Sequence, residues 1–271
     1  MIDIFQFAFM RNALYAGLLI SIVAGVVGTL LVVNRMVFIS GGVAHAAFGG
    51  IGLALFLGIS PLLGAGMFAV AAAMTMGVLT LRHRQRVDTI IGAVWATGMA
   101  IGIILIDLTP GYGADLMSYL FGSIMTVTPA DVRFMLLLAV VAVAFAALFY
   151  RQLIAMSFDE EFAALRNVPV RTLYFSLLVL ASLTVVVTIQ AVGLILVIAL
   201  LSIPHYLAER FVGSLVGMMA LSTVLSMLFT VTGLMLSFRF NLSSGATIIM
   251  VATTALFIGL ASGAIRKRLR G

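Results

Sequence analysis

Apolar runs of about 20 residues, separated by short polar breaks, fill almost the whole chain. A helix needs about 20 mostly apolar residues to cross the hydrocarbon core of a bilayer. The pattern therefore predicts an all-α, polytopic membrane protein with eight or nine transmembrane helices. Nine crossings would place the N-terminus outside the cell, and eight would place it inside. The runs are 13–33, 41–58, 62–81, 89–107, 132–150, 172–190, 192–208, 212–236 and 246–264.

The composition supports one membrane domain over residues 1–271. Hydrophobic residues make up 63% of the chain and charged residues 9%, whereas soluble domains carry about a quarter charged residues. The runs leave no room for a separate soluble domain. With no cysteine, the chain has no disulfide, thiolate ligand or iron–sulfur cluster. Any metal site must use histidine, carboxylate, carbonyl or methionine ligands.

The net charge of +6 is explained by basic loops on the cytoplasmic side of the membrane. Basic residues cluster at 82–86 and 266–270, and both clusters adjoin spans. Lys and Arg concentrate in cytoplasmic loops, so both clusters and the polar segment 151–171 are predicted to be cytoplasmic. Asp107 and Asp131 then fall outside. We expect no nucleic-acid partner.

His45 lies inside the uncharged run 39–58. An ionisable side chain at membrane depth is costly and marks a pathway or a binding site by default. Gly41, Gly49 and Gly52 recur on the same helical face as His45. Because glycines let another backbone approach closely, this face is predicted to pack against protein. His45 is therefore predicted to line a transport pathway.

The segment 151–171 is the longest hydrophilic stretch. Ser157 can cap a helix, and Asn167 suits a left-handed C-terminal position. The pattern predicts a short amphipathic cytoplasmic helix over about 157–168, which is either an interfacial linker or a docking element for a cytosolic partner. Its charged residues are Asp159, Glu160, Glu161 and Arg166, and its apolar stripe is Phe158, Phe162 and Leu165.

Other residues have ordinary structural interpretations. The stretch 117–125 is predicted to form a short interfacial or re-entrant helix. Trp95 is interpreted as an interfacial or packing aromatic. The 16 methionines are interpreted as core filling, for which the flexible thioether is well suited.

Motifs that would supply energy or hydrolysis are absent. A phosphate-binding Walker loop requires a Gly-Lys pair, yet the only lysine is Lys267. The chain also lacks the HExxH and GxSxG motifs of hydrolases. It is therefore predicted not to be an enzyme. Active transport would draw on a partner subunit or an ion gradient, and the few ionisable residues at membrane depth favour a partner ATPase.

Six stretches in order resemble the membrane permeases of bacterial ATP-binding-cassette importers for zinc, manganese or iron(II). Together they extend over nearly the whole chain, and their number makes the resemblance specific. They are ISGGVAHAAFGG at 39–50, VDTIIG at 87–92, DLMSYLFGSIMTVTPAD at 115–131, SFDEEFAALRNVPV at 157–170, AVGLILVIALLSIP at 191–204 and GLMLSFRFNLSSGATIIM at 233–250.

The resemblance implies a homodimeric permease in the bacterial plasma (inner) membrane. Its partners would be two cytosolic ABC ATPase subunits and a periplasmic or lipid-anchored metal-binding protein. The 157–168 helix would be the coupling helix, and its four charged residues would contact the ATPase. No cofactor would be bound permanently, because the divalent metal is the transported substrate.

The chain departs from the family at Gly41, where many members carry an aspartate one helical turn before the histidine. His205 and Glu209 offer a compensation, since they are four residues apart and can share a helical face. We hypothesise that His45 and His205, completed by Glu209 or water, form a transient site for a divalent cation. Alternatively, His205 and Glu209 form an interfacial cap with Arg210 as counter-ion.

Imidazole without a carboxylate mildly favours zinc over manganese and iron. Two other functions remain open at this point. The chain could be a gradient-driven carrier that works alone. It could also belong to an ATP-driven importer of a non-metal cargo such as a chelate or a vitamin, which would suit the incomplete set of ligands.

Overall fold

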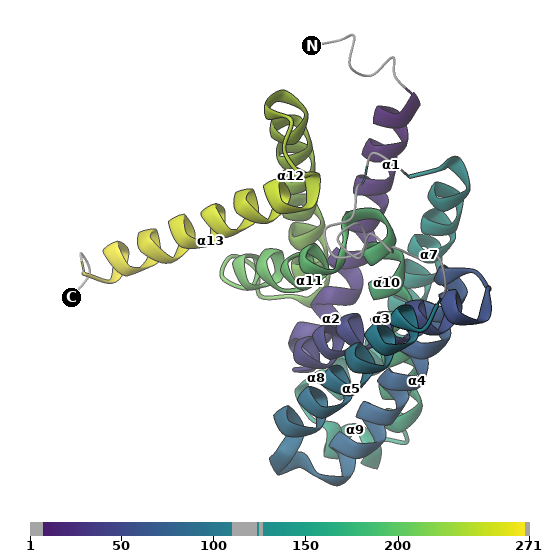
Figure 1. Cartoon of the computed structure of the whole chain (residues 1–271). Helices are drawn as coiled ribbons and strands as arrows, with labels where there is room; N and C mark the ends of the chain where they lie inside the picture. Colours follow the sequence, from purple (N-terminus) through teal and green to yellow (C-terminus); the bar gives the residue numbers. More distant parts are fainter. Residues whose placement is uncertain (1–7, 110–123, 125–126, 269–271) are drawn as a thin grey trace.

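The computed structural model describes residues 8–109, 124 and 127–268, and these residues form only helices and their connections (Figure 1). The short helix predicted over 117–125 lies almost entirely outside the described residues. The elements are α1 (Ala8–Val23), η2 (Ala24–Gly28), α2 (Thr29–Val33), α3 (Val37–Leu57), α4 (Pro61–Arg82), η3 (Arg84–Arg86), α5 (Val87–Asp107), α7 (Pro129–Leu148), α8 (Tyr150–Phe158), α9 (Glu160–Leu165), α10 (Val170–Val192), α11 (Leu194–Ala208), α12 (Leu215–Phe240) and α13 (Ser244–Arg268).

Eight helices in the described ranges are long and apolar enough to cross a membrane. The first is the continuous run of α1, η2 and α2, and the others are α3, α4, α5, α7, α10, α12 and α13. The predicted all-α, polytopic fold is confirmed. The run predicted over 192–208 is the shorter α11, whose 15 residues rise about 22 Å at 1.5 Å per residue.

Hydrogen bonds between helix ends fix which ends lie together. At one end, the Asn12 side chain donates to the Val127 carbonyl at 3.3 Å, and Gln190 donates to Asp131 at 2.9 Å. This end holds the beginnings of α1 and α7 and the end of α10.

The opposite end is joined by two other contacts. Ser157 bonds to Asn34 at 3.3 Å, and the hydroxyls of Thr80 and Tyr174 lie 3.3 Å apart. In Figure 1 this end, with α8, α9 and the α4–α5 connection, is at the bottom. It carries the basic cluster at 82–86, so the positive-inside rule makes it cytoplasmic.

The contacts of α12 with the first membrane helix, formed by α1, η2 and α2, give the direction of α12. A Cβ at Gly17 would lie 2.6 Å from Thr230, and a Cβ at Gly25 would lie 2.8 Å from the Cα of Thr223. The two helices are therefore antiparallel, and α12 runs from the cytoplasmic end to the outer end. Because α10 ends at the outer end and α12 begins at the cytoplasmic end, α11 and the residues after it connect the two ends. Among the described residues, the start of α1 therefore lies at the outer end.

Helix α3 is packed against two neighbours at glycines. A Cβ at Gly49 would lie 2.6 Å from the Gly98 carbonyl oxygen on α5, and a Cβ at Gly52 would meet the Gly102 carbonyl on the same helix. On another side, a Cβ at Gly50 would meet the backbone of Gly64 on α4. The predicted role of Gly49 and Gly52 in helix packing agrees with these contacts, in which backbone lies against backbone.

The cytoplasmic segment begins its short helix later than predicted. The cap is Asp159, whose carboxylate accepts the Phe162 N–H at 2.9 Å, so the prediction that Ser157 caps the helix is wrong. Ser157 still belongs to α8, where its hydroxyl donates to the Leu153 carbonyl at 2.7 Å. Asn167 takes the predicted left-handed conformation, with φ 59°.

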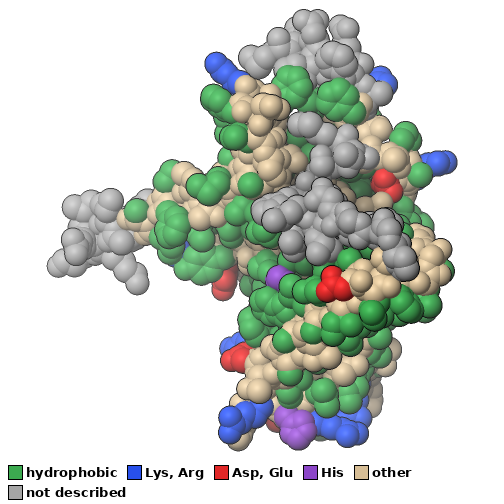
Figure 2. All heavy atoms as spheres, viewed as in Figure 1, with side chains coloured by type: hydrophobic (Ala, Val, Ile, Leu, Met, Phe, Trp, Pro, Cys, Tyr) green, Lys and Arg blue, Asp and Glu red, His purple; other side chains and the backbone are tan. Residues whose placement is uncertain are grey.

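Apolar and basic side chains occupy different parts of the surface, as expected for a membrane protein. Figure 2 shows green side chains over the flanks of the molecule, whereas most of the blue Lys and Arg side chains lie near its upper and lower ends. Helices α1, α3 and α10 are mostly buried, and α5, α7, α12 and α13 expose most of their surface. The buried helices form the core that positions His45.

Replacing Gly49 or Gly52 with alanine should destabilise the protein, because the new methyl group would collide with a backbone carbonyl. The expected loss is about 1–3 kcal/mol, as for other overpacked cores. Thermal unfolding in detergent, followed by circular dichroism, measures it. Gly66→Ala and Gly92→Ala are matched controls on α4 and α5, since a Cβ at either position meets nothing within 4 Å. Equal melting temperatures for all four variants would contradict the packing argument.

Candidate functional site

His45 lies in the middle of the glycine-packed helix α3 and is half-buried. Its imidazole stacks on the indole of Trp95 from α5, with ring centroids 3.9 Å apart and planes inclined by 11°. Its Nδ1 is buried and has no hydrogen-bond partner among the described residues. The structure thus holds an imidazole inside a helix long enough to span the membrane, and one nitrogen of that ring has no hydrogen-bond partner among the described residues.

Gly41 precedes His45 by one helical turn and faces α11. A Cβ at Gly41 would lie 3.6 Å from the Ile198 Cδ1, which is an ordinary van der Waals contact. Unlike Gly49 and Gly52, this glycine is therefore not needed for close backbone approach. The position has room for the start of a side chain.

His205 is fully buried on α11 and faces η2. Its Nε2 lies 2.9 Å from the Ala24 carbonyl, and since a carbonyl only accepts, Nε2 carries the proton. The ring fills the space beside Gly28, where a Cβ would collide with it. Ala24 and Gly28 bound the five-residue π-helical turn η2, a feature that often marks functional sites.

The hypothesised ligand set of His45, His205 and Glu209 is not assembled in this conformation. Within the described ranges, no group of three or more His, Asp or Glu side chains is placed to hold a metal ion. His45 contacts α5, the protonated Nε2 of His205 is directed to η2, and Glu209 is exposed. Helical spacing was a poor guide here because it does not show what packs beside each side chain: His205 is buried against η2, whereas Glu209 is exposed.

The contacts of Arg210 also differ from those expected under the alternative hypothesis, in which Arg210 was the counter-ion of an interfacial cap formed by His205 and Glu209. Its guanidinium donates to the Tyr206 hydroxyl at 2.9 Å and to the Gly259 carbonyl at 3.1 Å. It also lies 4.9 Å from the centre of the Tyr206 ring. These contacts tie the end of α11 to α13.

The four charged residues of the predicted coupling helix are all exposed. Asp159 caps α9, and the Arg166 guanidinium lies over the Phe162 ring at 5.3 Å. Phe158 and Leu165 are 88% and 83% exposed. Large apolar side chains this exposed on a short, charged, cytoplasmic segment indicate a surface that a partner covers.

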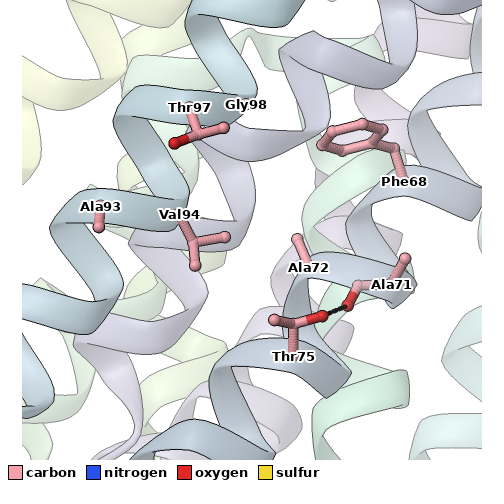
Figure 3. Close-up of a pocket in the computed structure, with 8 residues that line it drawn as sticks. All are labelled: Phe68, Ala71, Ala72, Thr75, Ala93, Val94, Thr97 and Gly98. Carbon is pink, nitrogen blue, oxygen red and sulfur yellow. Dashed lines mark hydrogen bonds between the residues drawn. The ribbon is translucent and has the colours of Figure 1, made fainter.

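A cavity of about 360 Å³ opens between α4 and α5 (Figure 3). Its wall is formed by Phe68 and small residues, with Thr75 and Thr97 as the hydroxyl-bearing side chains. The Thr75 hydroxyl donates to the Ala71 carbonyl at 2.8 Å. Because these lining residues include no imidazole or carboxylate, the cavity is not a metal site.

Sequence reasoning missed Trp95 as a partner of His45. The available signal was the spacing of Gly98 and Gly102 on α5, which mirrors the glycines of α3. Two glycine-faced helices pack closely, and Trp95 lies one turn before Gly98. The glycine-lined face of α5 therefore pointed to Trp95 as the aromatic residue that packs against His45.

Comparison with known proteins decides the family. A family model described as the ABC 3 transport family matches residues 6–263. The chain belongs to the ABC 3 transport family. The family predicted from the six sequence stretches is thereby confirmed, together with its transport role. A multi-pass protein of this family resides, in bacteria, in the plasma membrane.

Relatives of this ABC transporter chain match nearly its whole length. It is 51% identical to an uncharacterized membrane protein of Synechocystis, with 96% of this chain and 93% of the relative covered. It is 32% identical to the manganese transport system membrane protein MntC of Listeria monocytogenes, with 93% and 90% covered. A solved structure, PsaBC from Streptococcus pneumoniae in complex with Fab, matches with a TM-score of 0.85 and 32% identity over 95% of this chain and 93% of that chain.

His205→Ala should destabilise this ABC transporter subunit, because it leaves the buried Ala24 carbonyl without its donor. The expected cost is about 1–3 kcal/mol, seen as a lower melting temperature in detergent. His83→Ala is the matched control, since His83 is exposed at the end of α4. A His205→Ala protein that melts normally but no longer transports would instead support a ligand role for His205.

Proposed function

We propose that this chain is the permease subunit of an ATP-binding-cassette importer for first-row divalent metal ions. It works by alternating access and is driven by a separate ATPase subunit. The observation that carries the proposal is His45, an imidazole with an unpartnered nitrogen inside a helix packed by glycines. Membership of the ABC 3 family and a relative named as a manganese transport protein support the same function.

The ATPase docks, in this proposal, on the surface formed by α9 and the end of α8. Phe158 and Leu165 supply apolar contacts, while Glu160, Glu161 and Arg166 supply charged contacts around them. Exposed apolar side chains next to charges provide the anchors and the polar rim of a protein interface. The hydrogen bond between Ser157 and Asn34 connects this surface to the end of α2, through which ATPase movements can reach the membrane helices.

The complete importer contains two copies of this chain, two ATPase subunits and a periplasmic or lipid-anchored metal-binding protein. Helices α5, α7, α12 and α13 leave most of their surface uncovered in the single chain. Part of that surface faces lipid and part faces the second copy. The binding protein delivers the ion to the outer end, where α1 and α7 begin.

The chemistry of His45 and the names of the relatives point to different metals. Imidazole without a neighbouring carboxylate suits zinc better than manganese, and Gly41 removes the carboxylate. A relative such as MntC carries manganese in its name. We propose zinc as the preferred ion, because the ligand chemistry belongs to this chain.

The test of the function is uptake of isotopic Zn²⁺ and Mn²⁺ by cells that express the complete transporter. His45→Ala should abolish uptake of the preferred ion, because the imidazole is the ligand at membrane depth. The variant should still fold and associate with the ATPase. Normal uptake by His45→Ala would contradict the proposal, as would transport of a chelate or a vitamin in place of free ions.

A second experiment distinguishes an ATP-driven importer from a gradient-driven carrier that works alone. The double variant Phe158→Ser, Leu165→Ser should lose co-purification of the ATPase and ATP-dependent uptake together. Leu242→Ser is the control, because Leu242 is similarly apolar and 57% exposed but follows α12 at the outer end. A carrier driven by a gradient would keep its uptake in the double variant.

Gly41→Asp should strengthen metal binding and shift selectivity towards manganese. The carboxylate would lie one turn before His45 on the same face, and oxygen ligands suit manganese. We expect the half-saturating Mn²⁺ concentration to fall about tenfold, which corresponds to roughly 1.4 kcal/mol. Gly41→Ala adds the Cβ without the carboxylate and should behave as wild type. An equal change in both variants would assign the effect to packing.

A further inference from the structure

We propose that Trp95 is a positioning residue for the metal pathway, one that fixes the plane of the His45 imidazole and so presents one ring nitrogen to the ion. The inference rests on the proposed function and assigns a role that neither the motifs nor the family resemblance gave to this residue. In this proposal the indole of Trp95 on α5 helps to set the affinity of His45 on α3 for the metal ion.

The geometry of the two rings is that of a stack. Their centroids are 3.9 Å apart and their planes are inclined by 11°. The lone pair of an imidazole nitrogen lies in the plane of the ring and points outward from its edge. A stack covers the face of the imidazole and leaves the edge available, so Trp95 can hold the ring without blocking coordination.

The indole is itself held in place. Its Nε1 donates to the Met99 sulfur at 3.0 Å, one turn further along α5. The two helices are in register because a Cβ at Gly98 would lie 2.7 Å from the Ala46 Cα, and Ala46 directly follows His45. The backbone contact between α3 and α5 thus sets the separation at which the two rings meet.

A stack is needed here because the usual restraint on a ligating histidine is missing. Histidines that bind metals normally donate their second ring N–H to a carboxylate, a carbonyl or a water, which fixes the orientation of the ring. The Nδ1 of His45 is buried and has no such partner within the described part of the chain. Stacking energy of an aromatic pair replaces that hydrogen bond. Once the ion has bound, its charge polarises the neutral imidazole, and the electron-rich indole face stabilises that polarised ring.

The first experiment compares Trp95→Phe and Trp95→Leu in cells that express the complete transporter, with Zn²⁺ and Mn²⁺ supplied separately. Trp95→Leu removes the aromatic face, and we expect its half-saturating metal concentration to rise about tenfold, as for loss of an orienting partner. Its maximal uptake rate should be largely kept. Trp95→Phe keeps a face for stacking and should rescue most of the loss. A merely structural role would lower the maximal rate together with the amount of folded protein.

A second measurement reads the stack directly in the wild-type complex. Trp95 is the only tryptophan of the chain, so subtracting the emission of the Trp95→Phe complex isolates its fluorescence. Adding Zn²⁺ or Mn²⁺ alone to the purified complex should change this difference emission in the wild type and leave it unchanged in His45→Ala. This measurement does not depend on whether Trp95→Leu folds.

The outcomes distinguish the inference from the function on which it rests. Uptake with normal half-saturation in Trp95→Leu, or a difference emission that saturating metal leaves unchanged, overturns the role of Trp95 while metal import stands. Absence of metal uptake by the wild type overturns the proposed function and the inference together.

Discussion

The contact on which this structure depends is the approach of the α3 backbone to the backbones of α4 and α5. Lipid is as apolar as a leucine side chain, so helices in a bilayer are not driven together by the hydrophobic effect and depend on close van der Waals packing. Gly49 and Gly52 face carbonyls of α5, and Gly50 faces the backbone of α4. Helix α3 is thereby held on two sides, and a polar residue placed between these glycines has a fixed position. The stacking of His45 on Trp95 is a consequence of that register.

A second constraint comes from the need to satisfy polar groups at membrane depth. No water is available there, so each exposed backbone or side-chain group must find a partner in the protein. The π-helical turn η2 places the Ala24 carbonyl where His205 can donate to it, and Gly28 makes room for the ring. The glycines of this turn serve two neighbours, because Gly25 faces α12. One irregular turn thus joins three helices.

The sequence predicted the features that depend on one helix at a time. Span positions follow from apolar length, and the left-handed Asn167 follows from an asparagine at the end of a helix that Pro169 prevents from continuing. Features that depend on a neighbour's identity were not accessible in this way. The cap at Asp159 in place of Ser157 reflects the extension of α8, and the π-helical turn has no recognised residue pattern. The direction of His205 depends on which helix packs beside it, and the spacing of His205 and Glu209 could not supply that information.

The glycine at position 41 and the stack on Trp95 both bear on the balance between binding the ion and releasing it. A carboxylate one turn before His45 would add a ligand and hold the ion more tightly. Without it, His45 offers its nitrogen alone and obtains its orientation from an aromatic face, which adds no coordinating atom. In the proposed transport cycle the ion must leave the site on every turnover, and conduction needs binding that is favourable enough to enter yet weak enough to release. An imidazole oriented by stacking meets both conditions, because the ring is fixed before the ion arrives while the number of protein ligands stays low.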